Sequence, residues 1–379
     1  MQIVSNVIVM DYLNRFYCGD VPLTECISKS TLAGDFAYKD SYTDWDFYGS
    51  VDIIFTLYVM GLLYQYTDEN SRAQWAEKIL SCQDENGYFT KKNATAHGKE
   101  HATAYAISGL ILLSKDTNYI QALRPCGEYV ELIKSKAKLT KFIDKMGLRF
   151  PQLYKGKGLY GSLKKSSWHL GWHNIWPASH IGGGALAAIQ MSQDLYIEAG
   201  LVSKEQMSVF FENAVSELNQ RVDAKTGLWK KGFHDVFIKD ATVRDVGGAA
   251  HFLWIYDALN AEKQSKMALI NSCLGHQTDS GLLKEKPYCI DFDFVNILCR
   301  AYFDLPEEQK KEVFADVNEF IGRNYKSVTT FFEHRENLAQ YDNSHGFPGA
   351  LCTLAEAQKF GVGSEDEMVH HPFDSVCWL

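Results

Sequence analysis

The stretch Gln83-Asp-Glu-Asn-Gly87-Tyr-Phe89, followed after a polar loop by His101-Ala-Thr-Ala-Tyr-Ala-Ile-Ser-Gly-Leu-Ile-Leu-Leu113, decides the fold. Its first part has the composition of a tight turn around a glycine. Its second part is a run of small and apolar residues long enough for a helix that is buried on all sides. The sequence therefore predicts a turn, a loop and a buried helix in that order.

The same order recurs along the chain. It is clear at Asp223-Ala-Lys-Thr-Gly227-Leu-Trp229 before the apolar run 245–254, and at Gln277-Thr-Asp-Ser-Gly281-Leu-Leu283 before the run 291–299. Looser copies precede the apolar segments that begin near residues 50, 180 and 345. Six copies indicate a repeat protein, in which each unit buries its apolar face against its neighbours.

Amphipathic stretches separate the apolar ones, for example at 71–82, 203–221 and 306–325. Apolar helices alternating with amphipathic helices are typical of helical hairpins arranged as an inner and an outer layer. We expect an all-α protein, an (α/α)6 toroid formed by residues 1–379 as a single domain. An open helical solenoid is the alternative, but the repeats are unequal in length and polar caps at the ends are missing.

Composition excludes several classes of protein. Charged residues make up 22% of the 379 residues and hydrophobic residues 46%, which excludes a disordered chain. The net charge of −9 argues against a nucleic-acid partner. Aromatic residues are abundant, with 8 Trp, 20 Tyr and 22 Phe, and they either fill a large core or line a cavity whose ligand stacks on rings.

The cysteines and the apolar runs indicate a location. Nine dispersed cysteines without a C-x-x-C pair suit reduced thiols rather than a disulfide framework. The N-terminal residues lack a basic region and a cleavage site, and no apolar run approaches 18 residues. We expect a cytoplasmic protein without a membrane span, in an unknown oligomeric state.

Acidic residues and histidines recur at the starts of the six predicted inner helices. In a toroid these helices run parallel, so their first turns meet at one mouth of the central cavity. The candidate catalytic residues are Asp52, His101, His180, Asp245, Asp293 and His345. Imidazoles and carboxylates in one pocket are suited to acid–base chemistry. The alternative is that each Asp is a helix N-cap and each His a core residue.

A second concentration of candidate residues surrounds Gly171. Tryptophans and histidines on one loop are suited to stacking against a sugar and hydrogen bonding to it. The candidate binding residues on this loop are Trp168, His169, Trp172, His173 and Trp176, and Trp45, elsewhere in the chain, is a further candidate. His169 and His173 have the spacing of two zinc ligands on a helix, but the glutamate of an H-E-x-x-H motif is missing and Gly171 favours a loop. We therefore expect no metal and no other cofactor.

Three further residues are candidates for substrate binding. Arg244 and Arg335 could pair with a carboxylate or phosphate, and Asp291 lies two positions before Asp293. Each also has an ordinary structural interpretation, as an ion pair or a residue on a solvated face.

The segment from Gln83 to Leu113, with Gln-x-x-x-Gly-x-Phe before His-x-Thr-x-Tyr-Ala, resembles the repeats of protein prenyltransferase β subunits and squalene-hopene-type cyclases. The resemblance implies a toroid of helical hairpins. It does not extend to function, because the Asp, Cys and His that bind zinc in prenyltransferases have no matching set here. Of the cyclase motif Asp-x-Asp-Asp, only two acids remain, in Asp291-Phe-Asp293.

A second resemblance is to uncharacterised bacterial toroids that are suspected of a part in polysaccharide metabolism. It rests on Trp45-Asp-Phe-Tyr-Gly-Ser-Val-Asp52, Gly247-Gly-Ala-Ala-His251 and His371-Pro-Phe, together with the His101 segment. Fold alone does not fix function.

These observations leave three hypotheses for function. The first is an enzyme that acts on a sugar or an anionic glycan, as a hydrolase, lyase or epimerase, with a small molecule or an oligosaccharide as its partner. The second is a terpenoid or prenyl-transfer enzyme in which aromatic faces stabilise a cation. The third is an interaction module without catalysis.

Overall fold

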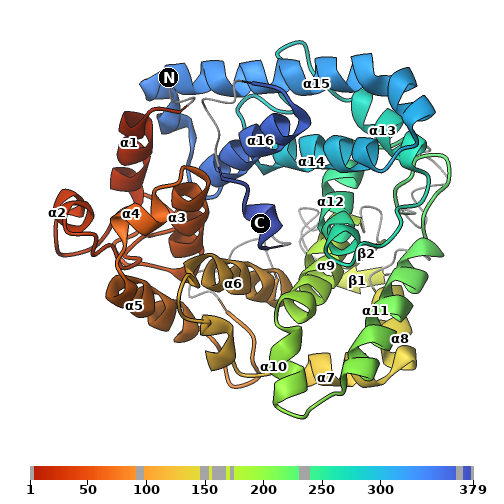
Figure 1. The fold of residues 1–379 in the computed structure, drawn as a ribbon, viewed down its shortest axis with the longest axis horizontal. Helices are drawn as coiled ribbons and strands as arrows, with labels where there is room; N and C mark the ends of the chain where they lie inside the picture. The colour runs from red at the N-terminus through yellow and green to blue at the C-terminus, as the bar shows by residue number, and fades with distance from the viewer. Residues whose placement is uncertain are drawn as a thin grey trace.

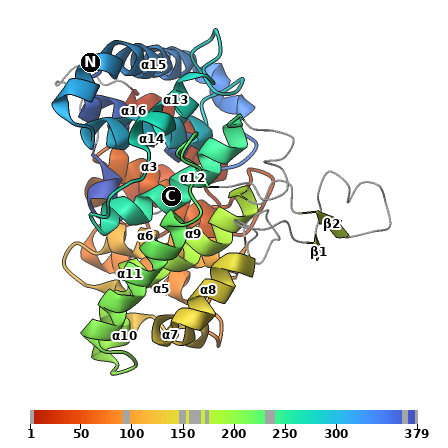
Figure 2. The same cartoon turned by 90° about the vertical axis from the view of Figure 1, so that its right-hand side faces the viewer.

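The computed structural model describes residues 4–90, 98–145, 153–155, 168–170, 175–229, 240–363 and 370–376. Their regular structure is almost entirely helical, which confirms the all-α prediction. The strands β1 (Leu153–Lys155) and β2 (Trp168–Leu170) pair as a short antiparallel ribbon, which stands apart from the helices in Figure 2. Among the described residues no helix is long and apolar enough to cross a membrane.

Six helices form a closed circuit of contacts, in which each packs on the next and the last returns to the first (Figure 1). They are α3 (Phe47–Val59), α6 (Lys99–Leu113), α9 (Ile175–Met191), α12 (Val243–Ala258), α14 (Cys289–Phe303) and α16 (Gly346–Phe360). These inner helices are buried on nearly every side, and α3 buries all but one of its 13 residues. Their apolar, small-residue composition is therefore explained by their surroundings.

A second set of helices lies outside this circuit in Figure 1. Its main members are α1 (Asn6–Phe16), α5 (Glu69–Leu80), α7 (Gly127–Lys134), α8 (Lys136–Lys145), α11 (Lys204–Asn219), α13 (Lys266–Leu274) and α15 (Glu307–Glu333). Short elements connect them: α2 (Leu23–Ser28), α4 (Leu63–Tyr66), η1 (Tyr119–Ala122), α10 (Gln193–Glu198), η4 (Arg335–Gln340) and η6 (Pro372–Asp374). These helices are amphipathic; the 27 residues of α15, for example, bury a single stripe.

The turn of the repeat forms as the sequence predicts. Gly87, Gly227 and Gly281 have φ angles of +89°, +70° and +84°. This left-handed region strains any residue with a Cβ atom and favours glycine. The turn therefore requires glycine at this position because of its positive φ angle, which explains why glycine occurs there in all three clear copies.

The glutamine that opens two of the copies holds its turn and joins it to the next hairpin. The Gln83 Nε2 donates to the carbonyl of Gly87 at 2.9 Å and to that of Arg124 at 3.0 Å. The equivalent Gln277 Nε2 donates to Gly281 at 3.3 Å and to Phe320 at 2.7 Å. The repeated sequence thus encodes a repeated connection between neighbouring hairpins.

The segment that contains η6 enters the middle of the inner helices, where the C label stands in Figure 1. The ring of Phe373 lies 4.7 Å from Phe292 of α14, 5.6 Å from Trp254 of α12 and 6.4 Å from Phe55 of α3, measured between ring centroids. Because these three rings come from three inner helices, Phe373 and its contacts form an aromatic plug on the axis of the circuit.

A buried carboxylate fastens this segment to the inner helices. The Glu356 Oε1 of α16 accepts from His371 Nε2 at 2.7 Å, Asn296 Nδ2 at 2.7 Å and Arg300 Nη2 at 3.1 Å. Burial raises the pKa of Glu356, but the hydrogen bond from His371 and the positive charges nearby outweigh it and hold the pKa below its usual value. Glu356 is therefore ionised at neutral pH and binds the segment electrostatically.

Candidate active site

The first turns of the inner helices meet at one end of the circuit. Tyr48, in the first turn of α3, places its hydroxyl 2.5 Å from the Nδ1 of His101 in the first turn of α6. The start of α16 lies against the start of α14, since a Cβ atom on Gly349 would stand 2.7 Å from the backbone of Cys289. The predicted convergence of helix starts is thus present in the contacts of α3, α6, α14 and α16.

Asp52 is the centre of one buried network at this end. The hydroxyl of Tyr105 in α6 donates to its Oδ1, and the Ser344 Oγ donates to its Oδ2 at 2.5 Å. The Nδ1 of His345 lies 2.8 Å from Oδ1. Asp52 is fully buried, so these donors, supplied by α6 and by the residues just before α16, compensate for its lost hydration.

Tyrosine rings surround His345. The ring of Tyr105 lies 5.5 Å away, that of Tyr48 6.0 Å and that of Tyr288 6.4 Å, between centroids. Burial, followed by the negative charge of Asp52, raises the pKa of both Tyr48 and Tyr105 well above the usual value. Both phenols therefore stay protonated at neutral pH, and Tyr105 donates its hydrogen bond to Asp52.

Three further imidazoles form a separate cluster beside this network. His101, His180 and His251, from α6, α9 and α12, each offer a ligand nitrogen, and all three nitrogens lie within 4.8 Å of one another. The ring centroids are 4.8–6.1 Å apart. Burial, and then the charge of His345, lowers the pKa of His180 to about 4, and burial likewise lowers the pKa of His251. These two rings are therefore neutral at neutral pH. We call this group the histidine cluster.

Two glycines of α9 allow the helices that carry the cluster to approach one another. A Cβ atom on Gly184 would stand 2.7 Å from the backbone nitrogen of His101, and one on Gly183 would stand 2.7 Å from the carbonyl oxygen of His251. Real Cβ atoms are not found so close to backbone atoms. The Gly182-Gly-Gly184 run thus brings α6 and α12 against α9 at the level of the histidines.

Two of the aligned carboxylates have structural partners instead. Asp245 forms a capping box with Thr242, whose backbone nitrogen lies 2.8 Å from the Asp245 Oδ2. Asp291 accepts from the backbone nitrogens of Leu283 and Tyr288 and from the Asn324 side chain, at 2.9–3.0 Å. Burial raises the pKa of Asp291 to about 6. Both carboxylates satisfy helix starts and the loops before them.

Asp293 is the remaining aligned carboxyl group. It lies one turn into α14 and is almost completely buried. Burial, followed by the charge of Asp291, raises its pKa well above the usual value, and Lys284 lowers it only in part. Burial therefore favours the protonated form of Asp293, in contrast to Asp52, whose oxygens accept hydrogen bonds from three donors.

The other candidate residues are not brought into this group. Arg244 is exposed, and Arg335 is exposed and pairs with Asp11. Trp45 is partly buried and lines a separate cavity of about 520 Å³ together with Asp44 and Lys78. For five candidates the side chains lie outside what the structure describes: Trp168, His169, Trp172, His173 and Trp176.

Sequence reasoning missed His251, Tyr105 and Ser344 as site residues. His101, His180 and His251 are the third, sixth and ninth residues of their helices, so each lies one turn deeper than the last. An alignment on helix starts therefore selected Asp245 in α12 and passed over His251. The available signal was Gly247-Gly-Ala-Ala-His251, a run of small residues that ends in a histidine.

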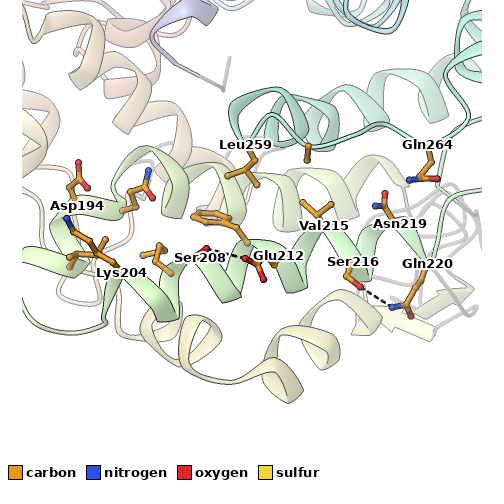
Figure 3. A pocket seen from close by; sticks show the side chains of 15 residues that line it. Asp194, Lys204, Ser208, Glu212, Val215, Ser216, Asn219, Gln220, Leu259 and Gln264 are labelled. Carbon is orange, nitrogen blue, oxygen red and sulfur yellow. Dashed lines mark hydrogen bonds between the residues drawn. The ribbon is translucent and has the colours of Figure 1, made fainter. Parts of the chain in front are cut away.

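Two described cavities lie elsewhere. A groove of about 1090 Å³ runs along the outer helix α11, between α10 and the residues after α12, with Phe211, Val215 and Leu259 among its lining residues (Figure 3). A smaller cavity of about 270 Å³ adjoins the aromatic plug and is lined by Trp254, Arg300 and Phe373 among others. Neither is lined by the histidine cluster or by Asp52.

Comparison of the chain with protein families, curated proteins and solved structures finds no match. The resemblance to prenyltransferase and cyclase repeats stays a prediction, with which the helical architecture is compatible.

Proposed function

We propose that the chain is a single-domain (α/α)6 toroid and an enzyme that performs acid–base chemistry on a sugar or an anionic glycan at the starts of the inner helices. The closed circuit of six inner helices supports the toroid. The clustering of titratable groups at one end of that circuit supports an active site.

The observation that carries the proposal is the Asp52–His345 pair. A buried carboxylate oxygen at 2.8 Å from Nδ1 fixes the orientation of the His345 ring. Proton exchange with a substrate then takes place at Nε2. Since both oxygens of Asp52 already accept hydrogen bonds, its role is to position His345, and it is a poor nucleophile.

A base needs an acid for hydrolysis, elimination or epimerisation. Asp293 is the candidate, because burial raises its pKa, and a carboxyl group with a raised pKa can donate a proton to a leaving oxygen. The partial positive charge of the helix starts favours a substrate that carries a carboxylate.

The test is turnover of a panel of neutral and uronate-containing oligosaccharides, followed by mass spectrometry of the products. We expect the wild type to convert an anionic member and His345→Gln to lose activity about 10²–10⁴-fold. His334→Gln, which changes an exposed histidine outside the site, should keep full activity.

Two results would overturn the proposal. A wild type that converts no oligosaccharide would remove the substrate class, and a His345→Gln variant with full turnover would remove the base. Prenyl diphosphates in the same panel test the terpenoid alternative, which the paired acids Asp291 and Asp293 suggested.

A further inference from the structure

The histidine cluster has the composition of a metal site. We propose that His101, His180 and His251 bind one divalent transition-metal ion, with zinc as the ion to test. This inference does not depend on the proposed function, because it concerns only the ligand set and its surroundings. Three imidazole nitrogens favour zinc and its neighbours in the first transition row, whereas magnesium and calcium prefer oxygen ligands.

The spacing of the nitrogens is close to that of a coordination sphere. Nitrogens bound tetrahedrally to zinc at about 2.0–2.1 Å stand about 3.4 Å apart. The three nitrogens here lie within 4.8 Å, so a shift of about 1 Å in each ring closes the gap. The ring planes meet at 57–83°, as expected for imidazoles that approach one point from three helices.

The outer partners of two rings orient them for this role. The Nδ1 of His101 contacts the Tyr48 hydroxyl at 2.5 Å, and the Nδ1 of His251 lies 3.4 Å from the Ser179 hydroxyl. The carbonyls of Gly247 and Gly248 also hydrogen-bond to the His251 ring. Metal-bound histidines characteristically use their second nitrogen in this way, which assigns Nε2 of both rings to the metal.

The framework around the cluster is rigid. Gly183 and Gly184 hold the backbones of α6 and α12 directly against α9. Below the cluster the ring of Trp254 lies 5.5 Å from His251 and 5.6 Å from Phe373, so the cluster rests on the aromatic plug. Burying an imidazole costs free energy because the ring loses its hydration. Apolar rings would fill the same space without this cost, so packing alone does not explain three histidines here.

The ligand number indicates the kind of site. Structural zinc sites use four protein ligands, whereas catalytic sites use three and keep a fourth position for water or substrate. The cluster supplies three. Tyr48, which hydrogen-bonds to His101, packs with its ring 4.8 Å from that of Tyr105, which hydrogen-bonds to Asp52. A metal held there would lie beside the network assigned above to proton transfer.

The experiment uses the full chain, stripped with a chelator and titrated with zinc alone by calorimetry, with the bound metal counted by mass spectrometry. We expect one zinc per chain in the wild type, and at least 100-fold weaker binding in His180→Gln and His251→Gln. Cobalt substitution should give an absorption spectrum typical of tetrahedral nitrogen coordination in the wild type and not in His180→Gln or His251→Gln. The control His334→Gln makes the same change outside the cluster and should bind like the wild type.

Tyr48→Phe keeps the ring and removes only the outer hydrogen bond to His101, so it tests the site even if a ligand variant does not fold. It should weaken zinc binding about 10–100-fold. The inference is overturned if the wild type binds no zinc after dialysis. It is equally overturned if a folded His180→Gln, or Tyr48→Phe in its place, binds zinc as tightly as the wild type.

Discussion

At the scale of single residues, Asp52 shows how a buried charge is stabilised in this protein. Moving a carboxylate out of water costs several kcal/mol in proteins, and the cost is offset only by well-placed donors. Asp52 receives three, from Tyr105, Ser344 and His345. These donors come from opposite ends of the sequence, so the same hydrogen bonds that hold His345 also hold α16 to α3.

Asp52→Asn should reduce the free energy of unfolding by about 3 kcal/mol, because the amide NH2 replaces one of the two accepting oxygens and turns hydrogens toward a buried donor, and because the negative charge is lost. Urea unfolding followed by circular dichroism measures the change. The matched control is Asp279→Asn, on an exposed turn, which should change stability by less than about 0.5 kcal/mol. Equal stability of both variants would show that Asp52 is not held as described.

The repeat pattern could place Asp52, His101, His180 and His345 at the same end of the inner helices, where the structure brings them together. It could not separate these residues from Asp245, because an aspartate that holds a histidine and an aspartate that caps a helix have the same position in the pattern. The depth at which a side chain lies, and the direction it faces, depend on the axial offset between neighbouring helices. Packing contacts between the helices set that offset, and a sequence pattern does not contain them.

At the scale of elements, the contacts of α9 depend on glycines, which have no side chain to keep the neighbouring helices apart. Its glycines face the backbones of α6 and α12, and small residues at such a crossing set how closely two helices approach. The turn glycines have a different cause, a positive φ, and sequence predicted them because the turn motif repeats. The close approach at Gly184 could not be predicted in this way, since it depends on a neighbouring helix.

Gly184→Ala should therefore destabilise the protein by about 1–3 kcal/mol and move His101 away from His180. Thermal unfolding measures the first effect and zinc titration the second. Gly322→Ala in α15 is the control, because a Cβ atom there meets nothing within 4 Å. It should be neutral or stabilise by up to about 1 kcal/mol, since alanine is the better helix former. A stabilising Gly184→Ala would contradict the packing described for α9.

At the scale of the whole molecule, the segment around Phe373 joins α3, α12, α14 and α16 at the centre. Glu356 is the charged part of that junction. Its pKa is lower in the folded protein than its ordinary value near 4.5, so the unfolded chain takes up a proton first as the pH falls. Its contribution to stability is therefore complete above pH 4.5 and is lost as the pH falls through the folded pKa.

Glu356→Gln should weaken the protein at pH 7, because His371 and Arg300 lose their carboxylate, and should flatten the decline in stability below pH 4.5. Unfolding free energies measured from pH 7 to pH 3 test both effects. Glu319→Gln, on the exposed face of α15, should keep the wild-type pH profile. A Glu356→Gln profile parallel to that of the wild type would show that this carboxyl group is not the one that titrates.

The contact between α3 and α16 also has a consequence for how the protein is made. Asp52 and His345 are 293 positions apart, and closing a loop of that length costs about 5 kcal/mol of chain entropy beyond a constant term. During synthesis the face of α3 that receives α16 stays exposed to solvent until α16, which ends at Phe360, has left the ribosome. We expect shorter nascent chains to bind chaperones strongly, and release from them to coincide with the emergence of α16.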